Sequence, residues 1–266
     1  MTGGLVTGGD GRLAGAGSGG AALDALTRPV VILVGHSGSG KTEIAVNLAF
    51  GLRGRGAAVT VVDLDLVKPY FRCRLAKDDL EARGIRLVAP GGDRFYADLP
   101  ILAPEVRSAA GDGAGRKGWV ILDVGGNDLG ARVLGSFSGL LDRTATDLLF
   151  VVNANRPFAA DLPSQRTMLR EVEAAARLGV TGLVANTHLM QETTAETVRA
   201  GIRAARELET ATGIPLRFCA VPQELARLFD AQARTADDPP MLVMERHIVA
   251  PFAPWPSGPR RRSTVV

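Results

Sequence analysis

The chain has 266 residues, of which 46% are hydrophobic, 22% are charged and two are cysteines. This is the composition of an ordinary globular protein. It excludes a disulfide framework and, since no apolar run approaches about 20 residues, a membrane-spanning helix. Lys and Arg number 31 against 28 Asp and Glu, and the three arginines at 260–262 supply the whole excess. The globular part is therefore neutral overall, and we expect a protein that binds no nucleic acid. The low cysteine count favours the cytoplasm, and the tail, rich in Pro, cannot form an amphipathic helix that would dock on a membrane.

Composition divides the chain into three regions. Residues 1–27 are rich in Gly and Ala and cannot bury much apolar surface, so we expect them to be disordered. One folded domain is expected over 28–250, and the tail at 251–266, rich in Pro and Arg, is expected to be loose. Within the domain, the long connection between 90 and 118 is expected to be functional or mobile.

Apolar runs inside the domain predict strands, and the amphipathic segments between them predict helices. Strands are expected at 30–34, 59–62, 85–89, 119–122, 148–152, 183–185 and 216–219. Thr193 and Glu196 form a sequence pattern typical of a capping box at the start of a helix. Because the strands are apolar without alternation and helices separate them, we predict an α/β fold. Its sheet would be mostly parallel and doubly wound, with helices on both faces.

A motif of the form Gly-x-x-x-x-Gly-Lys-Thr follows the first expected strand and opens an amphipathic helix. Its glycines let backbone N–H groups approach phosphate oxygens, and the helix directs the positive end of its dipole at the same anion. We predict that Lys41 contacts the β- and γ-phosphates and that the Thr42 hydroxyl binds Mg²⁺. The expected nucleotide-binding residues of this phosphate loop are Gly35, His36, Ser37, Gly38, Ser39, Gly40, Lys41 and Thr42.

Polar side chains stand at the ends of other expected strands, namely Asp63 with Asp65, Asp123, Asn153 and Asn186. In a parallel sheet these ends meet at the edge where ligands bind, so we expect the side chains to converge on the phosphate loop. Asp123 would hold Mg²⁺ beside Thr42. Of Asp63 and Asp65, one would orient the attacking water or accept a proton, and the other would support the metal.

Further segments at this edge have predicted binding roles. The main chain at Gly125 and Gly126 would sense the γ-phosphate, because glycine permits close approach. Asn186 would hydrogen-bond a purine base, with the loop at Pro222 against the other edge of the base. A basic segment would clamp phosphate or a second anionic substrate through Lys68, Arg72 and Arg74.

The phosphate loop, Asp63-Leu64-Asp65, Asp123-Val124-Gly125-Gly126 and Asn186 together resemble the MinD/ParA-type ATPases, over about residues 29–230. The resemblance implies ATP rather than GTP, because related GTPases recognise guanine through Asn-Lys-x-Asp and Leu189 stands where that Asp would be. It also implies that Asp65 and Lys41 are catalytic, with Asp65 positioning water, and that Asp123 belongs to the Mg²⁺ shell. The implied protein is a Mg-ATP-binding switch with slow ATP hydrolysis.

Members of that family carry a second loop lysine where this chain has His36, and the lysine reaches the partner's nucleotide across a dimer. Imidazole is shorter and mostly neutral at pH 7, so a monomer and a homodimer both stay open.

The alternative function is a small-molecule kinase, in which Asp65 accepts a proton from the acceptor hydroxyl. An anionic acceptor would then be held by Arg72, Arg74 and Arg94, in place of a protein client. A metal-loading chaperone would need paired Cys or His ligands, which the sequence lacks.

Overall fold

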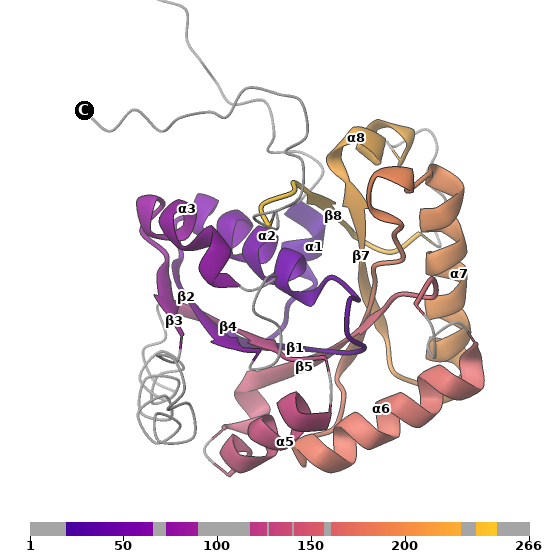
Figure 1. Ribbon diagram of the computed structural model, residues 1–266, viewed down its shortest axis with the longest axis horizontal. Coiled ribbons are helices and arrows are strands. Elements are labelled where there is room, and N and C mark those ends of the chain that lie inside the picture. The colour runs from indigo at the N-terminus through magenta and orange to yellow at the C-terminus, as the bar shows by residue number, and fades with distance from the viewer. Residues whose placement is uncertain are drawn as a thin grey trace, which may run out of the picture.

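The computed structural model of the protein describes residues 20–65, 73–89, 118–126, 128–139, 141–156, 161–229 and 238–248. In these residues eight strands form one sheet in the order β3-β2-β4-β1-β5-β6-β7-β8, and all neighbouring strands are parallel (Figure 1). The strands are β1 (Val30–Val34), β2 (Ala58–Leu64), β3 (Arg86–Val88), β4 (Gly118–Val124), β5 (Thr146–Val152), β6 (Gly182–Ala185), β7 (Leu216–Pro222) and β8 (Met241–Met244).

Helices cover both faces of the sheet (Figure 1). One face carries α1 (Gly20–Asp24), α2 (Lys41–Gly54) and α3 (Lys77–Ala82), and the other carries α5 (Asp128–Phe137), α6 (Leu162–Ala176) and α7 (Ala195–Thr212). The short α8 (Gln223–Ala226) follows β7. The predicted α/β fold with a doubly wound parallel sheet is confirmed. No helix in the described ranges is both long and apolar enough to cross a membrane.

The strand β1 shows why the central strands lack an alternating pattern. Val30, Ile32 and Val34 pack into the core beneath α5 and α6, whereas Val31 and Leu33 pack into the core beneath α2. All five side chains are at most 2% exposed. A strand that is buried on both faces needs apolar residues at every position, and this places the loop that follows β1 at the centre of the sheet edge.

Among the helices and strands, α1, α8 and β8 were not expected from the sequence. In α1, which lies within the segment predicted to be disordered, Ala22 and Leu23 are buried. Leu23 packs on Gly51 of α2, where an added Cβ would lie 2.9 Å from a Leu23 methyl carbon, and α1 also contacts β8. These contacts join segments that are far apart in the sequence, so they could not be predicted from the composition of residues 1–27. The predictions for 1–19, for 90–117 and for the tail at 251–266 lie outside the described residues.

At the start of α7 the capping box begins one residue later than predicted. Thr194, rather than Thr193, is the N-cap, and its hydroxyl accepts a hydrogen bond from the backbone N–H of Thr197. The Thr197 hydroxyl, rather than Glu196, completes the box by accepting from the Thr194 N–H. Glu196 instead pairs with Arg203 along the helix, at 2.7 Å. A threonine hydroxyl can therefore take the place that Glu or Gln usually has in this motif.

Asp147 holds the starts of the central strands together. Its carboxylate accepts hydrogen bonds from the backbone N–H groups of Thr27 and Arg28, at 3.1 Å each, and from the hydroxyl of Thr181 at 3.0 Å. The Arg28 guanidinium lies 3.8 Å away. These bonds join the segment before β1 to β5 and β6, whose opposite ends carry the candidate site.

Candidate nucleotide-binding site

The phosphate loop leaves β1 and passes directly into α2, as the motif requires. At its last turn Gly40 has a φ of 89°, which is the left-handed region that favours glycine. A Cβ at Gly40 would lie 2.2 Å from the Asn186 side-chain nitrogen and 3.2 Å from His188 Nε2. Gly40 is therefore required both for the turn and for the close approach of the loop that follows β6.

The carbonyl oxygens of the loop are held by side-chain groups. Lys41 Nζ donates to the carbonyls of Gly35 and His36, at 3.0 Å each, and His36 Nδ1 lies 2.7 Å from the carbonyl oxygen of Ser37. A carbonyl that already accepts a hydrogen bond repels an anion less strongly. Lys41 is 6% exposed, so its ammonium group is a buried positive charge inside the loop.

Two more loop carbonyls are held by residues from distant strands. Arg156, which follows β5, donates from Nε to the Gly38 carbonyl over 2.8 Å. Asn186, which follows β6, donates from Nδ2 to the Ser39 carbonyl over 2.7 Å. The predicted purine-binding residue Asn186 thus contacts the loop itself through its amide nitrogen, and Pro222 ends the next strand, β7, at the same edge of the sheet.

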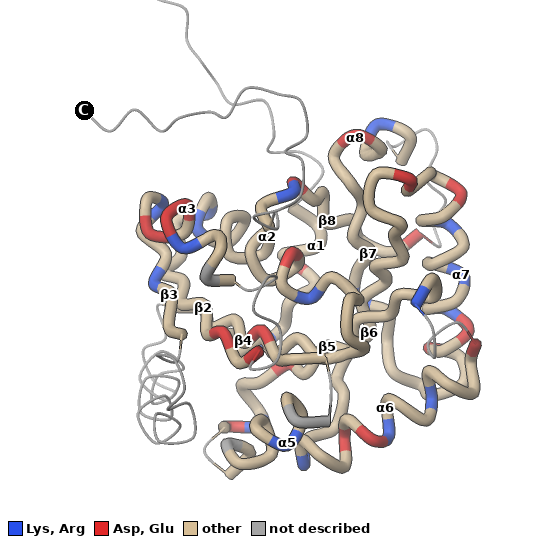
Figure 2. The backbone as a smooth tube through the Cα atoms, viewed as in Figure 1, with Lys and Arg blue, Asp and Glu red and all other residues tan. Residues whose placement is uncertain are grey.

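The predicted acidic residues gather at the ends of β2 and β4, where Figure 2 shows acidic segments side by side. Asp63 and Asp123 are register partners on these two strands and are fully or almost fully buried. Asp65 is also buried, and its backbone N–H donates to Asp63 Oδ1 over 3.0 Å. The structure therefore brings all three predicted carboxylates to the same edge as the phosphate loop.

Thr42 and Asp123 are in direct contact, as a shared Mg²⁺ site would require. The Thr42 hydroxyl donates to Asp123 Oδ2 over 2.7 Å, and the Cys73 thiol lies 3.4 Å from the same oxygen. Burial, together with the charge of Asp63, raises the pKa of Asp123 to about 7. Burial and the neighbouring Asp123 also raise the pKa of Cys73 well above its ordinary value, so the thiol is neutral.

These oxygen donors fit magnesium better than a transition metal. The described residues contain no group of three or more His, Cys, Asp or Glu side chains arranged to hold an ion by themselves. Magnesium commonly takes one or two protein oxygens and completes its shell with water and substrate phosphates. A divalent cation beside Thr42 and Asp123 would also offset the repulsion between the buried carboxylates.

The turn after β4 lies against the phosphate loop. A Cβ at Gly126 would come within 2.5 Å of the Ser37 nitrogen and 2.7 Å of Lys41 Nζ. No side chain larger than that of glycine fits at this point. The predicted contact of Gly125 and Gly126 with the γ-phosphate is thus compatible with the position of the turn beside Lys41.

His188, which the sequence analysis did not place in the site, lies beside Gly40. Burial and the charges of Arg156 and Arg246 lower its pKa to about 4, so the imidazole is neutral at pH 7. Asn153 is also buried at this edge, and its Oδ1 accepts a hydrogen bond from the Asn155 N–H. Arg156 was missed as well, although a basic residue three positions after a strand-end asparagine was visible in the sequence.

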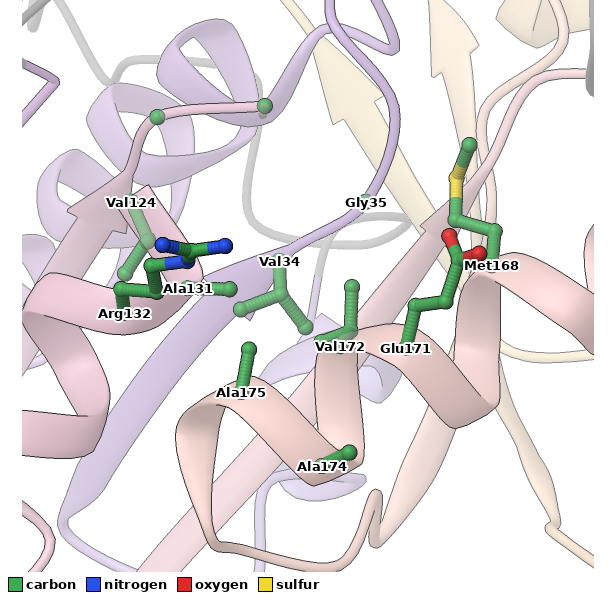
Figure 3. A pocket seen from close by; sticks show the side chains of 12 residues that line it. Val34, Gly35, Val124, Ala131, Arg132, Met168, Glu171, Val172, Ala174 and Ala175 are labelled. Atoms are coloured by element: carbon green, nitrogen blue, oxygen red, sulfur yellow. The ribbon is translucent and has the colours of Figure 1, made fainter. Parts of the chain in front are cut away.

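A cavity of about 680 Å³ opens beside the loop, between α5 and α6 (Figure 3). Its floor is formed by Val34, Gly35 and the Gly125–Gly126 turn, and its walls are mostly apolar. Arg132 on α5 and Glu171 on α6 stand on opposite sides of it.

The structure does not describe the basic segment that was predicted to clamp phosphate. Outside the described part of the chain lie Lys68, Arg72, Arg94 and the side chain of Arg74.

Comparison with known proteins assigns the chain to a family of nucleotide-binding domains. Residues 30–216 match the family model described as the CobQ/CobB/MinD/ParA nucleotide-binding domain, CbiA. No curated protein matches the sequence significantly.

Among solved structures, FtsY of Thermotoga maritima aligns with 19% identity and a TM-score of 0.50, over 75% of this chain and 67% of that one. FtsY of Elizabethkingia anophelis in complex with GDP aligns with 18% identity and a TM-score of 0.48, over 74% of this chain. The present chain spans 58% of the length of that protein. The likeness to the Thermotoga structure concerns the fold alone. By the match to the family model, which covers most of the sheet and the whole phosphate loop, this chain belongs to the CobQ/CobB/MinD/ParA nucleotide-binding family.

Proposed function

We propose that this protein is a Mg²⁺-dependent ATP-binding switch that hydrolyses ATP slowly. The observation that carries the proposal is the 2.7 Å contact between Thr42 and Asp123 at the end of a complete phosphate loop. Lys41 and the loop N–H groups would bind the phosphates, and Thr42 and Asp123 would hold the metal. Magnesium, when bound, neutralises charge on the β- and γ-phosphates. Asp65 would orient the water that attacks the γ-phosphorus.

A preference for ATP over GTP rests on the residues after β6. Leu189 occupies the position at which related GTPases use an aspartate to accept from guanine, and its side chain is 45% exposed. His188, the residue before it, has no carboxylate with which to accept hydrogen bonds from guanine either. Calorimetric titration with each nucleotide in Mg²⁺ tests this preference, and tighter binding of GTP than of ATP would contradict it.

The Lys41→Ala variant tests the phosphate-binding assignment. This change removes the buried ammonium group, so we expect nucleotide binding to be lost while the thermal unfolding transition is kept. Lys77, which is exposed on α3, gives a matched control as Lys77→Ala. Unchanged ATP affinity in the Lys41 variant would refute the assignment.

Because His36 stands where MinD/ParA-type ATPases carry their second loop lysine, we place this chain in a branch of the family that lacks that lysine. Its ring lies on its own loop at Ser37, so this residue does not supply the long cation that a partner subunit would receive. We propose a cytoplasmic protein that binds no nucleic acid or membrane and turns over as a monomer, with a homodimer as the alternative. Light scattering of Asp65→Ala with ATP and with ADP distinguishes the two states.

The second candidate is a small-molecule kinase, and the cavity between α5 and α6 is the observation that favours it. The cavity shares Gly35 and Gly126 with the phosphate site, so an acceptor bound there would lie near the γ-phosphate. Arg132 would attract an anionic acceptor. A metabolite screen decides between the two functions, because a sharp rise in ADP release with one acceptor indicates a kinase and flat, slow release indicates the switch.

A further inference from the structure

Arg156 brings a second side-chain cation to the phosphate loop. Its Nε donates to the Gly38 carbonyl over 2.8 Å, and its guanidinium carbon lies 3.1 Å from the point that a Cβ on Gly38 would occupy. The guanidinium group therefore packs against the loop backbone. The residue is half-buried, which strengthens its electrostatic effect relative to that of an arginine in open solvent.

The turn that carries Arg156 is held on two sides. The Arg156 backbone N–H donates to the Asn153 carbonyl at 3.2 Å, so the turn is closed directly at the end of β5. The Ala154 N–H donates to the Thr187 hydroxyl at 3.0 Å, which ties the turn to the end of β6. Thr187 in turn packs on Gly201 of α7, where an added Cβ would lie 2.3 Å from the Thr187 Cβ. Arg156 thus projects from a backbone that two strands and a helix position.

The charge of Arg156 is not cancelled by the described residues around it. None of the ion pairs within the described residues includes Arg156, and its neighbour His188 is neutral at pH 7. The bond to Gly38 uses Nε, whereas the two terminal nitrogens of a guanidinium carry four more donors in a plane that suits phosphate oxygens.

We propose that Arg156 pairs with the terminal phosphate of the bound nucleotide, as a catalytic arginine supplied by the same chain. This inference rests on the proposed function. In hydrolysis, a water oxygen bonds to the γ-phosphorus and the bond to the β,γ-bridging oxygen breaks, with its electron pair remaining on ADP. The products are ADP, inorganic phosphate and one proton. Arg156 would stabilise the negative charge that spreads over the equatorial oxygens during this step.

Three variants test the inference, Arg156→Gln, Arg156→Lys and the control Arg170→Gln, which changes an exposed arginine of α6. For each we would measure kcat for ATP hydrolysis and the Kd values for ATP and ADP by calorimetry, all with Mg²⁺. We expect Arg156→Gln to lower kcat by about 10²- to 10³-fold and to weaken ATP binding, with ADP affinity changed less than about threefold. Arg156→Lys should recover part of kcat, and Arg170→Gln should match the wild type.

A wild-type kcat in Arg156→Gln would overturn the inference, and so would equal losses of ATP and ADP affinity at unchanged kcat, which indicate that Arg156 only supports the loop. Failure of the proposed function looks different. In that case the wild-type protein itself would bind no nucleotide in Mg²⁺, and Lys41→Ala would change nothing.

Discussion

The Asn47 side chain pairs with both backbone groups of Glu245, 198 residues further along the chain. Its Nδ2 donates to the Glu245 carbonyl and its Oδ1 accepts from the Glu245 N–H, each over 2.9 Å. One turn earlier, the carboxylate of Glu43 accepts hydrogen bonds from the backbone N–H groups of His247 and Ile248. Two side chains of α2 thus bind the segment after β8 much as a neighbouring strand would.

Replacing Asn47 by Ala should lower the free energy of unfolding by about 1–3 kcal/mol, because a backbone donor and a backbone acceptor lose their partner. Urea unfolding measures the change. Gln191, which is exposed in the 3₁₀ turn Met190–Glu192, provides the control variant Gln191→Ala, for which we expect a change of less than about 0.5 kcal/mol. If both variants unfold at the same urea concentration, the pairing of Asn47 with Glu245 contributes nothing to stability.

A single methyl group at Gly126 should block the site. The Cβ of Gly126→Ala would meet the Ser37 nitrogen at 2.5 Å and Lys41 Nζ at 2.7 Å, so the turn and the loop must separate. We expect at least about a tenfold loss of ATP affinity in calorimetry, equivalent to about 1.4 kcal/mol. Gly139→Ala is the matched control, because a Cβ at Gly139 has no described atom within 4 Å. Equal affinities in the two variants would argue against a close contact of the turn with the loop.

Asp123→Asn should separate stability from activity. Burial and the charge of Asp63 make the Asp123 carboxylate costly in the absence of a cation, as its raised pKa of about 7 indicates. The neutral amide removes this cost and can still accept from Thr42, so at pH 8 without Mg²⁺ we expect the variant to unfold at a higher temperature than the wild type. Its Mg²⁺-dependent turnover should fall by roughly 10- to 100-fold. A lower unfolding temperature together with normal turnover would contradict both roles of Asp123.

His188 should make stability depend on pH in the acidic range. Its pKa is lowered from 6.5 to about 4 by burial first and then by the charges of Arg156 and Arg246. The unfolded chain therefore binds a proton at His188 before the folded protein does, and stability is lost as the pH falls from about 6.5 to 4. The free energy of unfolding should fall by about 1.4 kcal/mol per pH unit at most.

The measurement is the difference in unfolding free energy between the wild type and His188→Gln over this range, since other groups titrate equally in both proteins. A difference that stays constant from pH 7 to pH 4 would show that His188 titrates normally in the folded state.

The central part of the fold could be predicted from the sequence because each signal is local. The phosphate loop is contiguous, and the apolar strands and amphipathic helices each show their own period within a few residues. Asp63, Asp65 and Asp123 were found because parallel strands end at one edge, whatever their order across the sheet. By contrast, α1 is ordered by its contacts with α2 and β8, and β8 is a strand because it pairs with β7, so neither element could be predicted from its own residues.

The sequence by itself therefore determined the α/β class, the phosphate loop and the edge of the sheet at which its polar residues meet. Tertiary structure alone decided that Arg156 holds Gly38, 118 residues away, that Asn186 holds Ser39, 147 residues away, and that Asn47 holds the segment after β8. The first two contacts depend on β1 lying next to β5, with β6 beyond it, and the third depends on the segment after β8 passing beside α2. Periodicity records which face of an element is buried, but it carries no information about which distant element covers that face.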